Sequence, residues 1–151
     1  MTANLSETSL AAYFGGDHDD CDDKWARVES LLDSGDAAAL KTAWQEFDQA
    51  TRRHLAMEEE VFFPAFEAAS GMGQSGPTMV MRQEHEQMRA LLDQIGFNIE
   101  AGDTDEAYDL GDTLHMLTQQ HNIKEEGMLY PMAEDVLATE WAGIRQQLEA
   151  Y

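Results

Sequence analysis

The sequence predicts an all-α fold: an antiparallel up-down four-helix bundle, built from two pseudo-symmetric helical hairpins, with a short C-terminal helix. Four long segments carry apolar residues at alternating spacings of three and four, as do helices that face a common core. None of the four alternates polar and apolar residues as an amphipathic strand does. The second half of the chain also repeats the pattern of the first at a constant offset of 67 residues, for example from His18 to His85.

The four apolar stripes define the four helices in chain order. The first is Phe14, His18, Cys21, Trp25, Val28 and Leu32, and the second is Leu40, Trp44, Phe47, Thr51, His54, Glu58, Val61 and Ala65. The third is Met81, His85, Met88, Leu92, Ile95 and Ile99, and the fourth is Ala107, Leu110, Leu114, Leu117, His121, Glu125, Met128 and Met132. Each stripe follows one face of a helix, so all four are predicted to line a single core.

Turn-forming residues separate the stripes. Residues 33–36 and 100–103 are short polar stretches that each contain a glycine, and connections of this length join antiparallel neighbours. Residues 70–77 form a longer, glycine-rich connection between the two hairpins. Residues 139–149 again place apolar residues at helical spacing, which predicts a short fifth helix across one end of the bundle.

The two hairpins, residues 17–67 and 84–134, align without a gap. The matched pairs are His18 with His85, Gly35 with Gly102, Asp36 with Asp103, His54 with His121, Glu58 with Glu125, and Pro64 with Pro131. Two such hairpins packed about an approximate two-fold axis make one four-helix bundle, in which each residue has a counterpart across the core. We therefore expect residues 1–151 to form a single domain.

The composition restricts the classes of partner. The chain has 30 acidic and 9 basic side chains and a formal net charge of −21, so its surface should repel nucleic acids and anionic membranes. Neither is expected as a partner. Cys21 is the only cysteine, which excludes an internal disulfide and a cysteine-rich metal site. The N-terminal residues lack the pattern of a targeting segment, and no apolar run reaches the ~20 residues of a membrane span, so we expect a cytoplasmic protein.

Four histidines and two glutamates stand out because they occupy the apolar stripes instead of the polar faces. The candidate metal ligands are His18, His54, Glu58, His85, His121 and Glu125. In each half, 36 residues separate the two histidines, and the second histidine precedes the glutamate by four. The last spacing stacks the two side chains on one face of a helix, ~6 Å apart along its axis. One ion can therefore bind both.

Buried carboxylates need a positive partner. An ionised carboxylate without one is costly in a protein interior, and no lysine or arginine shares these stripes at this level. Metal ions would neutralise the glutamates and use the imidazole lone pairs. Two halves then give two ions, each with two histidines and one glutamate, and the second carboxylate oxygens can bridge them. Such ligands suit iron or manganese, with zinc as the alternative, and six of them leave open positions for a small molecule.

The doubled motif resembles the hemerythrin-like, or HHE cation-binding, family. The resemblance covers roughly residues 17–134 and rests on His18, His54-x-x-x-Glu58, His85 and His121-x-x-x-Glu125. It implies a non-haem di-iron centre, bridged by two carboxylates, that binds dioxygen or nitric oxide. Oxygen carriers of this family use a fifth histidine one turn before the third-helix ligand, where this chain has Met81. The resemblance therefore implies a more open site than that of an oxygen carrier.

The sequence favours a binding role: a di-iron protein that binds dioxygen, nitric oxide or iron for sensing, storage or transfer. The alternative is a di-iron oxidoreductase that consumes peroxide or nitric oxide, or repairs iron centres. No general acid or base is evident beyond the ligands. The oxidoreductase is therefore the second interpretation, after the binding role. A structural zinc site is the third interpretation. The sequence does not identify a redox partner.

Other polar features have ordinary structural interpretations. His115 is expected to be exposed or to lie behind the ligands, and Cys21 is expected to fill space in the core. The acidic run within residues 17–23 is expected to favour a helix N-terminus. Pro64 and Pro131, six residues after the two glutamates, should kink or end the regular helix beyond the metal layer.

Overall fold

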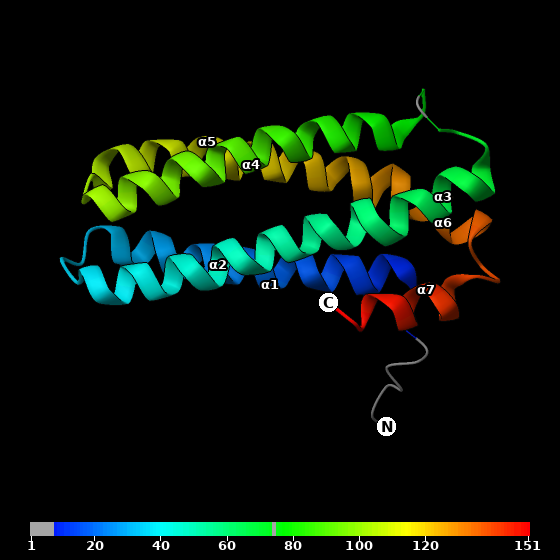
Figure 1. Ribbon diagram of the computed structural model, residues 1–151, viewed down its shortest axis with the longest axis horizontal. Helices are drawn as coiled ribbons and strands as arrows, with labels where there is room; N and C mark the ends of the chain where they lie inside the picture. The colour runs from blue at the N-terminus through cyan, green and yellow to red at the C-terminus, as the bar shows by residue number, and fades with distance from the viewer. Residues whose placement is uncertain (1–7, 74) are drawn as a thin grey trace.

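The computed structural model describes residues 8–73 and 75–151, and those residues form helices and no strand (Figure 1). In chain order the helices are α1 (Leu10–Leu32), α2 (Ala37–Met57), α3 (Phe63–Ser70), α4 (Pro77–Ala101), α5 (Thr104–Lys124), α6 (Tyr130–Val136) and α7 (Trp141–Leu148). Two π-helical turns, Glu58–Phe62 and Glu125–Leu129, join α2 to α3 and α5 to α6. The predicted all-α fold with a short C-terminal helix is confirmed.

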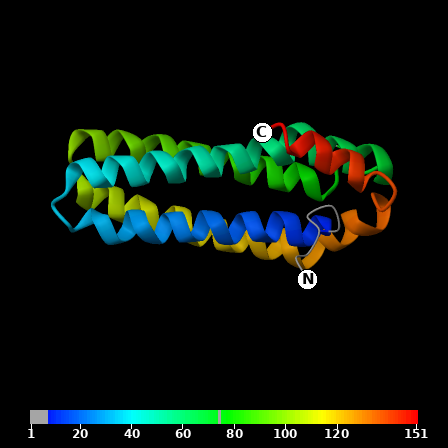
Figure 2. The same cartoon turned by 90° about the horizontal axis from the view of Figure 1, so that it is seen from below.

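The long helices run antiparallel as two hairpins. One hairpin is α1 with α2 and the other is α4 with α5. The two hairpins lie side by side in Figure 1, and in Figure 2, seen from below, the first lies in front of the second. Helix α1 also packs on α5, and α2 packs on α4, which closes the four helices around one core. Gly35 and Gly102 turn the chain at corresponding ends with φ of 75° and 78°, a left-handed conformation that glycine adopts without a steric penalty. The predicted bundle of two hairpins is therefore confirmed.

Two expectations concern membranes and targeting. Across residues 8–73 and 75–151, no helix is both long and apolar enough to cross a bilayer. Residues 1–7, where the sequence analysis expects no targeting segment, lie outside the described residues.

Side-chain caps fix where three of the long helices begin. The Ser9 side chain accepts from the Ala12 N–H at the start of α1, and Asp36 and Asp103 accept from backbone N–H groups in the same way for α2 and α5. These caps satisfy N–H groups that have no partner within the helix. Because α1 begins before the acidic run of residues 17–23, that run lies inside the helix, and its predicted role at a helix N-terminus is wrong.

Each π-helical turn begins with a motif glutamate. In the first turn the Phe63 N–H donates to the Glu58 carbonyl five residues back, whereas an α-helical N–H donates four residues back. Pro64 and Pro131 follow in the first turns of α3 and α6, where a missing N–H costs little. From the two prolines, the regular helix is predicted to kink or end beyond the metal layer. In the structure the regular α-helix ends earlier, where each π-helical turn begins at a glutamate.

The extra residue in each π-helical turn changes which side chains face the core after it. Beyond the turns, the sequence stripes continue through Val61, Ala65, Met128 and Met132. None of these four is buried, and Met128 is 48% exposed. The buried residues are instead Phe62, Phe63, Phe66, Leu129, Tyr130 and Ala133. The prediction is wrong here because it assumed an unbroken period of about 3.6 residues, while one extra residue rotates the following helix by roughly 100°.

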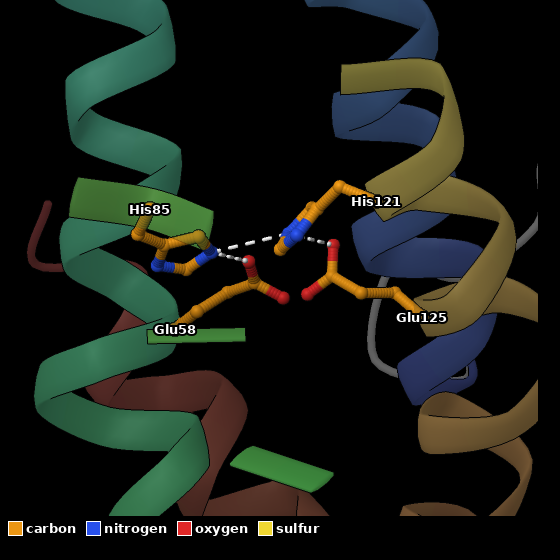
Figure 3. Close-up of side chains that lie close together, drawn as sticks. All are labelled: Glu58, His85, His121 and Glu125. Atoms are coloured by element: carbon orange, nitrogen blue, oxygen red, sulfur yellow. Dashed lines mark hydrogen bonds and ion pairs between the residues drawn. The ribbon is translucent and has the colours of Figure 1, made fainter. Parts of the chain in front are cut away.

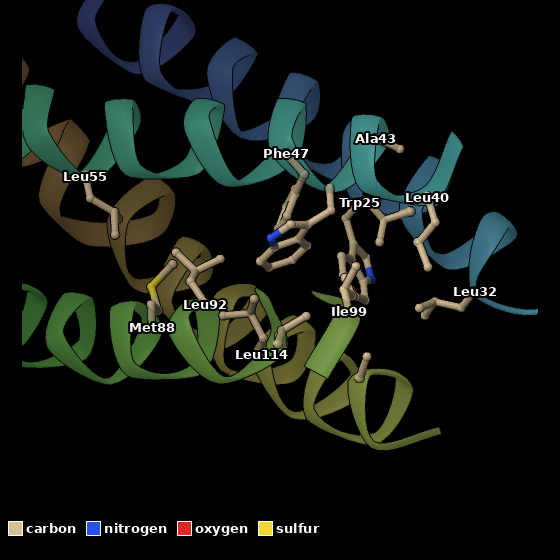
Figure 4. Close-up of a cluster of buried hydrophobic side chains, with 14 residues drawn as sticks. Trp25, Leu32, Leu40, Ala43, Phe47, Leu55, Met88, Leu92, Ile99 and Leu114 are labelled. Carbon is tan, nitrogen blue, oxygen red and sulfur yellow. The ribbon is translucent and has the colours of Figure 1, made fainter. Parts of the chain in front are cut away.

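Two apolar clusters fill the bundle. One contains Trp25 and Phe47 and lies toward the glycine turns (Figure 4). The other contains Phe62 together with Ile144 and Leu148 of α7. Helix α7 thus closes the second end of the bundle, as predicted for residues 139–149. The motif histidines and glutamates lie between the two clusters and are buried.

Gly111 in α5 leaves room for the Trp25 ring in the first cluster. A Cβ atom at residue 111 would lie 2.3 Å from that ring, which is too close for two carbon atoms. Gly111→Ala should therefore lower the free energy of unfolding by about 1–3 kcal/mol through overpacking. The matched control is Gly16→Ala in α1, because a Cβ atom there meets nothing within 4 Å among the described residues.

The control should be neutral or should stabilise the protein by up to ~1 kcal/mol, because alanine favours a helix interior more than glycine does. Urea unfolding of both variants in the presence of a chelator measures the difference. Equal effects of the two substitutions would show that the Trp25 ring has space to move.

Candidate metal centre

The four motif histidines form one buried layer across the bundle, with one histidine from each long helix. His18, His54, His85 and His121 are each at most 5% exposed. The rings pair within the hairpins, with centroids 4.7 Å apart for the first pair and 4.8 Å apart for the second. In the second pair the two Nε2 atoms are 3.2 Å apart. The fold therefore brings the four predicted histidines together with their Nε2 atoms facing Glu58 and Glu125.

Glu58 and Glu125 are fully buried, and Figure 3 shows Glu58 beside His85 and Glu125 beside His121. Each Oε1 atom lies near two Nε2 atoms: 3.3 Å for Glu58 to His54, 3.3 Å for Glu58 to His85, 3.2 Å for Glu125 to His18, and 3.0 Å for Glu125 to His121. The predicted arrangement gives each glutamate to the histidines of its own hairpin, with its second oxygen bridging to the other ion. In the structure a single oxygen of each carboxylate faces one histidine from each hairpin, a placement that suits the predicted bridging role.

Several atoms that face the centre of this cluster have no hydrogen-bond partner among the described residues. They are Glu58 Oε1, both carboxylate oxygens of Glu125, and His54 Nε2. A buried polar atom without a partner is costly, and a bound cation would supply the missing interaction. The residues present therefore fit a metal ion, because hydrogen bonds among themselves leave these atoms unsatisfied.

The donor atoms form two overlapping groups in which all atoms lie within 4.8 Å of one another. The groups are His18, His54 and Glu125, and Glu58, His85, His121 and Glu125. Ligand atoms bound to one ion at ~2.1 Å are about 3–4 Å apart. Both groups are thus close to the spacing of a coordination shell, and Glu125 belongs to both.

A second layer of carboxylates orients the histidines through Nδ1. The Nδ1–oxygen distances are 2.6 Å from His54 to Asp17, 3.0 Å from His121 to Glu84, 2.9 Å from His85 to Glu59, and 3.4 Å from His18 to Glu126. A carboxylate at Nδ1 leaves Nε2 available to a metal and makes the ring a stronger ligand. None of the four is predicted from the sequence to have this role. The repeat could have revealed them, because it pairs Asp17 with Glu84 and Glu59 with Glu126, so that a carboxylate recurs at each of these positions.

The family model of the hemerythrin HHE cation-binding domain matches residues 10–133. That range contains all four long helices and every residue of the histidine and glutamate layer. The chain belongs to the hemerythrin family. Comparisons with curated proteins and with solved structures give no significant match. The resemblance inferred from the doubled motif is confirmed, and the buried cluster of this hemerythrin domain fits metal binding.

The carboxylates of the hemerythrin domain favour protonated imidazoles when no metal competes. Burial favours the neutral ring, but the nearby Glu58 carboxylate and a hydrogen bond to Glu59 raise the pKa of His85 to about 9. Burial also opposes the charge on His54, but the Glu58 charge and the Asp17 hydrogen bond raise its pKa. Protons and metal ions therefore compete for the same inward nitrogens, as in any site with imidazole ligands.

Glu84→Gln should weaken metal binding by about 10–100-fold without removing a ligand. Glu84 holds the His121 ring through Nδ1, and a neutral amide holds it less firmly and polarises it less. Titration calorimetry with Mn²⁺ measures the change. Glu100→Gln is the matched control, because Glu100 is an exposed residue on the same helix and the substitution makes the same change in charge. Equal affinities for the two variants would show that Glu84 does not support the site.

Tyr130 is a buried polar residue that the sequence analysis missed. Its hydroxyl donates to Glu58 Oε2 at 2.9 Å and lies 3.2 Å from His18 Nε2. The sequence stripe placed Met128 toward the core at this level, and only the π-helical turn brings Tyr130 inward. The alignment of the hairpins pairs Tyr130 with Phe63. A tyrosine in one half where the other half has a phenylalanine is the sequence feature that could have revealed it.

A small cavity adjoins the histidine layer on the side of the Trp25 cluster. Its volume is ≈ 30 Å³, which is enough for about one or two water molecules. Its lining includes the rings of His18, His54 and His121 and the apolar side chains of Leu55, Met88 and Leu114. The lining also reaches His115, which is exposed as predicted.

Cys21 borders this cavity and is only half-buried, so the prediction that it fills space in the core is wrong.

Proposed function

We propose that this hemerythrin domain holds two iron ions and binds a small diatomic molecule, dioxygen or nitric oxide, for sensing, storage or transfer. The observation that carries the proposal is the buried layer of four imidazoles and two carboxylates, in which the described residues leave three carboxylate oxygens without a hydrogen-bond partner. Manganese and zinc are the alternative metals for such ligands. A cytoplasmic location belongs to the same proposal.

Six side chains would hold the metals: His18, His54, Glu58, His85, His121 and Glu125. Bound iron would supply a Lewis-acidic, redox-active position for the diatomic molecule. The two buried glutamates would neutralise part of the metal charge. Carboxylates at Nδ1 keep the histidine rings in the orientation that metal binding needs. Six protein ligands are too few to fill two coordination shells of five or six, which leaves room for the small molecule.

The cavity beside the histidines supports a small uncharged ligand. Its ≈ 30 Å³ admits one diatomic molecule or a peroxide and excludes an organic substrate, for which a pocket of about 300 Å³ or more is usual. Apolar side chains such as Leu55 and Leu114 form part of its wall. A net charge of −21 also disfavours anionic ligands and attracts divalent cations.

An oxidoreductase that consumes peroxide or nitric oxide, or acts on iron centres, is the second candidate function. The observation that favours it is Tyr130, a buried hydroxyl beside the cluster. Proton transfer to or from a positioned side chain accelerates many reactions, and no such group beyond the ligands is predicted from the sequence. Binding remains the first candidate function.

The test is to load the protein anaerobically with Fe²⁺, measure the iron content, and follow the visible spectrum after adding oxygen or nitric oxide. Two irons per chain and bands that reverse when the gas is removed support the binding role. Bands that form irreversibly while peroxide is consumed support the oxidoreductase. Tight zinc binding without a response to either gas supports a structural site. A chain that binds no metal overturns the proposal.

A further inference from the structure

The ligands and the carboxylates behind them match between the two halves of the hemerythrin domain, but Tyr130 has a counterpart without a polar group. The repeat pairs it with Phe63. The two rings occupy corresponding places: Tyr130 stacks on His18 with ring centroids 5.8 Å apart, and Phe63 stacks on His85 with centroids 5.5 Å apart. Both are fully buried. At this position the halves therefore differ by one hydroxyl group.

The hydroxyl distinguishes the two carboxylates of the cluster. It donates to Glu58 Oε2 at 2.9 Å, while Glu58 Oε1 faces the histidines. Neither oxygen of Glu125 has a hydrogen-bond partner within the described part of the chain. Hydrogen bonds to ionised acceptors are shorter and stronger than those between neutral groups. Glu58 is therefore held in place by one of its oxygens, while both oxygens of Glu125 are available to metal ions.

The geometry points to Tyr130 as a positioning residue that makes the two metal positions unequal. This inference rests on the proposed two-metal function. The position nearer His18 has the hydroxyl beside it, and the orientation of Glu58 is set by that hydroxyl. The position nearer His85 has only the Phe63 ring in the corresponding place. The two ions should therefore differ in affinity and in electronic environment.

Tyr130→Phe tests the inference, because it gives both halves a phenylalanine at this position. Wild type and variant are loaded anaerobically with ⁵⁷Fe²⁺ and compared by Mössbauer spectroscopy. The wild type should give two quadrupole doublets of equal area, and the doublets of the variant should converge. In calorimetric titrations with Mn²⁺, the two binding steps of the wild type should differ about tenfold in affinity, as expected for one charge-assisted hydrogen bond. The two steps of the variant should become alike.

Two further variants keep the test decisive. Tyr108→Phe removes an exposed hydroxyl elsewhere and should keep two separate doublets. Phe63→Tyr gives the other half its own hydroxyl and should also bring the doublets together, which provides a test if Tyr130→Phe does not fold. Equal sites in the wild type, or unequal sites that persist in Tyr130→Phe, would overturn the inference and leave the two-metal function intact. A wild-type protein that binds no metal would overturn both.

Discussion

Glu58→Gln should lower the affinity for metal by more than ~100-fold while the protein remains folded and helical. Glu58 Oε1 lies 3.3 Å from the Nε2 atoms of both His54 and His85, so its charge serves both histidine pairs. Loss of a residue that only supports a ligand already costs ~10–100-fold, and loss of a charged ligand should cost more. Calorimetric titration with Mn²⁺ measures the affinity, and circular dichroism measures the helix content.

The fold should survive this substitution because the neighbouring imidazoles can release their protons once the carboxylate is gone. Glu60→Gln is the matched control: Glu60 is exposed in the same π-helical turn, and the change in charge is the same. It should bind metal as the wild type does. Similar affinities for the two variants would show that the charge of Glu58 is not needed for binding, and the assignment of this residue as a ligand would be wrong.

The helices and the candidate ligands could be predicted from the sequence because both follow from spacings along a regular helix. Apolar residues three and four apart mark the buried face of a helix, and His54 lies over Glu58 for the same geometrical reason. The offset of 67 residues adds the symmetry of the bundle. From these spacings alone, His18 and His85 could be placed opposite residues that are far away in the chain.

The parts that could not be predicted depend on departures from that regular geometry. The π-helical turns move Tyr130 into the core and Met128 out of it, and nothing in a 3.6-residue pattern anticipates an inserted residue. The contact between Glu125 and His18, which lie in different hairpins, depends on how the helices pack. The repeat in the sequence predicts an approximate two-fold axis but not this packing. From the sequence, Asp17 is predicted only to belong to an acidic run that favours a helix N-terminus. Its role becomes evident only when the distance to His54 is known.

Metal loading should raise the thermal stability of this domain more than any single substitution should lower it. A ligand present at about 1,000 times its Kd adds roughly 4 kcal/mol per site, so two sites add roughly 8 kcal/mol. A chain of about 150 residues gains roughly 2–4 °C in Tm per kcal/mol, which predicts an increase on the order of 16–32 °C. Thermal unfolding with Mn²⁺ and with a chelator measures the difference. Glu58→Gln should lose most of the increase.

The increase in Tm on metal loading should grow as the pH rises, because protons compete with metal ions for the histidine nitrogens. The pKa of His85 is about 9 in the folded chain, against 6.5 for an ordinary imidazole. Its protonation therefore stabilises the metal-free fold fully below about pH 6.5, and this contribution is lost as the pH rises through about 9. Burial would raise the pKa of Glu59, but hydrogen bonds to His85 and Arg89 lower it to about 2, so its charge is constant across this window.

Metal binding needs neutral nitrogens and therefore strengthens over the same range in which the metal-free fold weakens. The gap in Tm between loaded and metal-free protein should be wider near pH 9 than near pH 6. Tm values for both forms at the two pH values give the result directly. A gap that stays constant or narrows would show that the metal does not displace protons from the buried histidines, and the cluster would then have to hold its cation through the carboxylates alone.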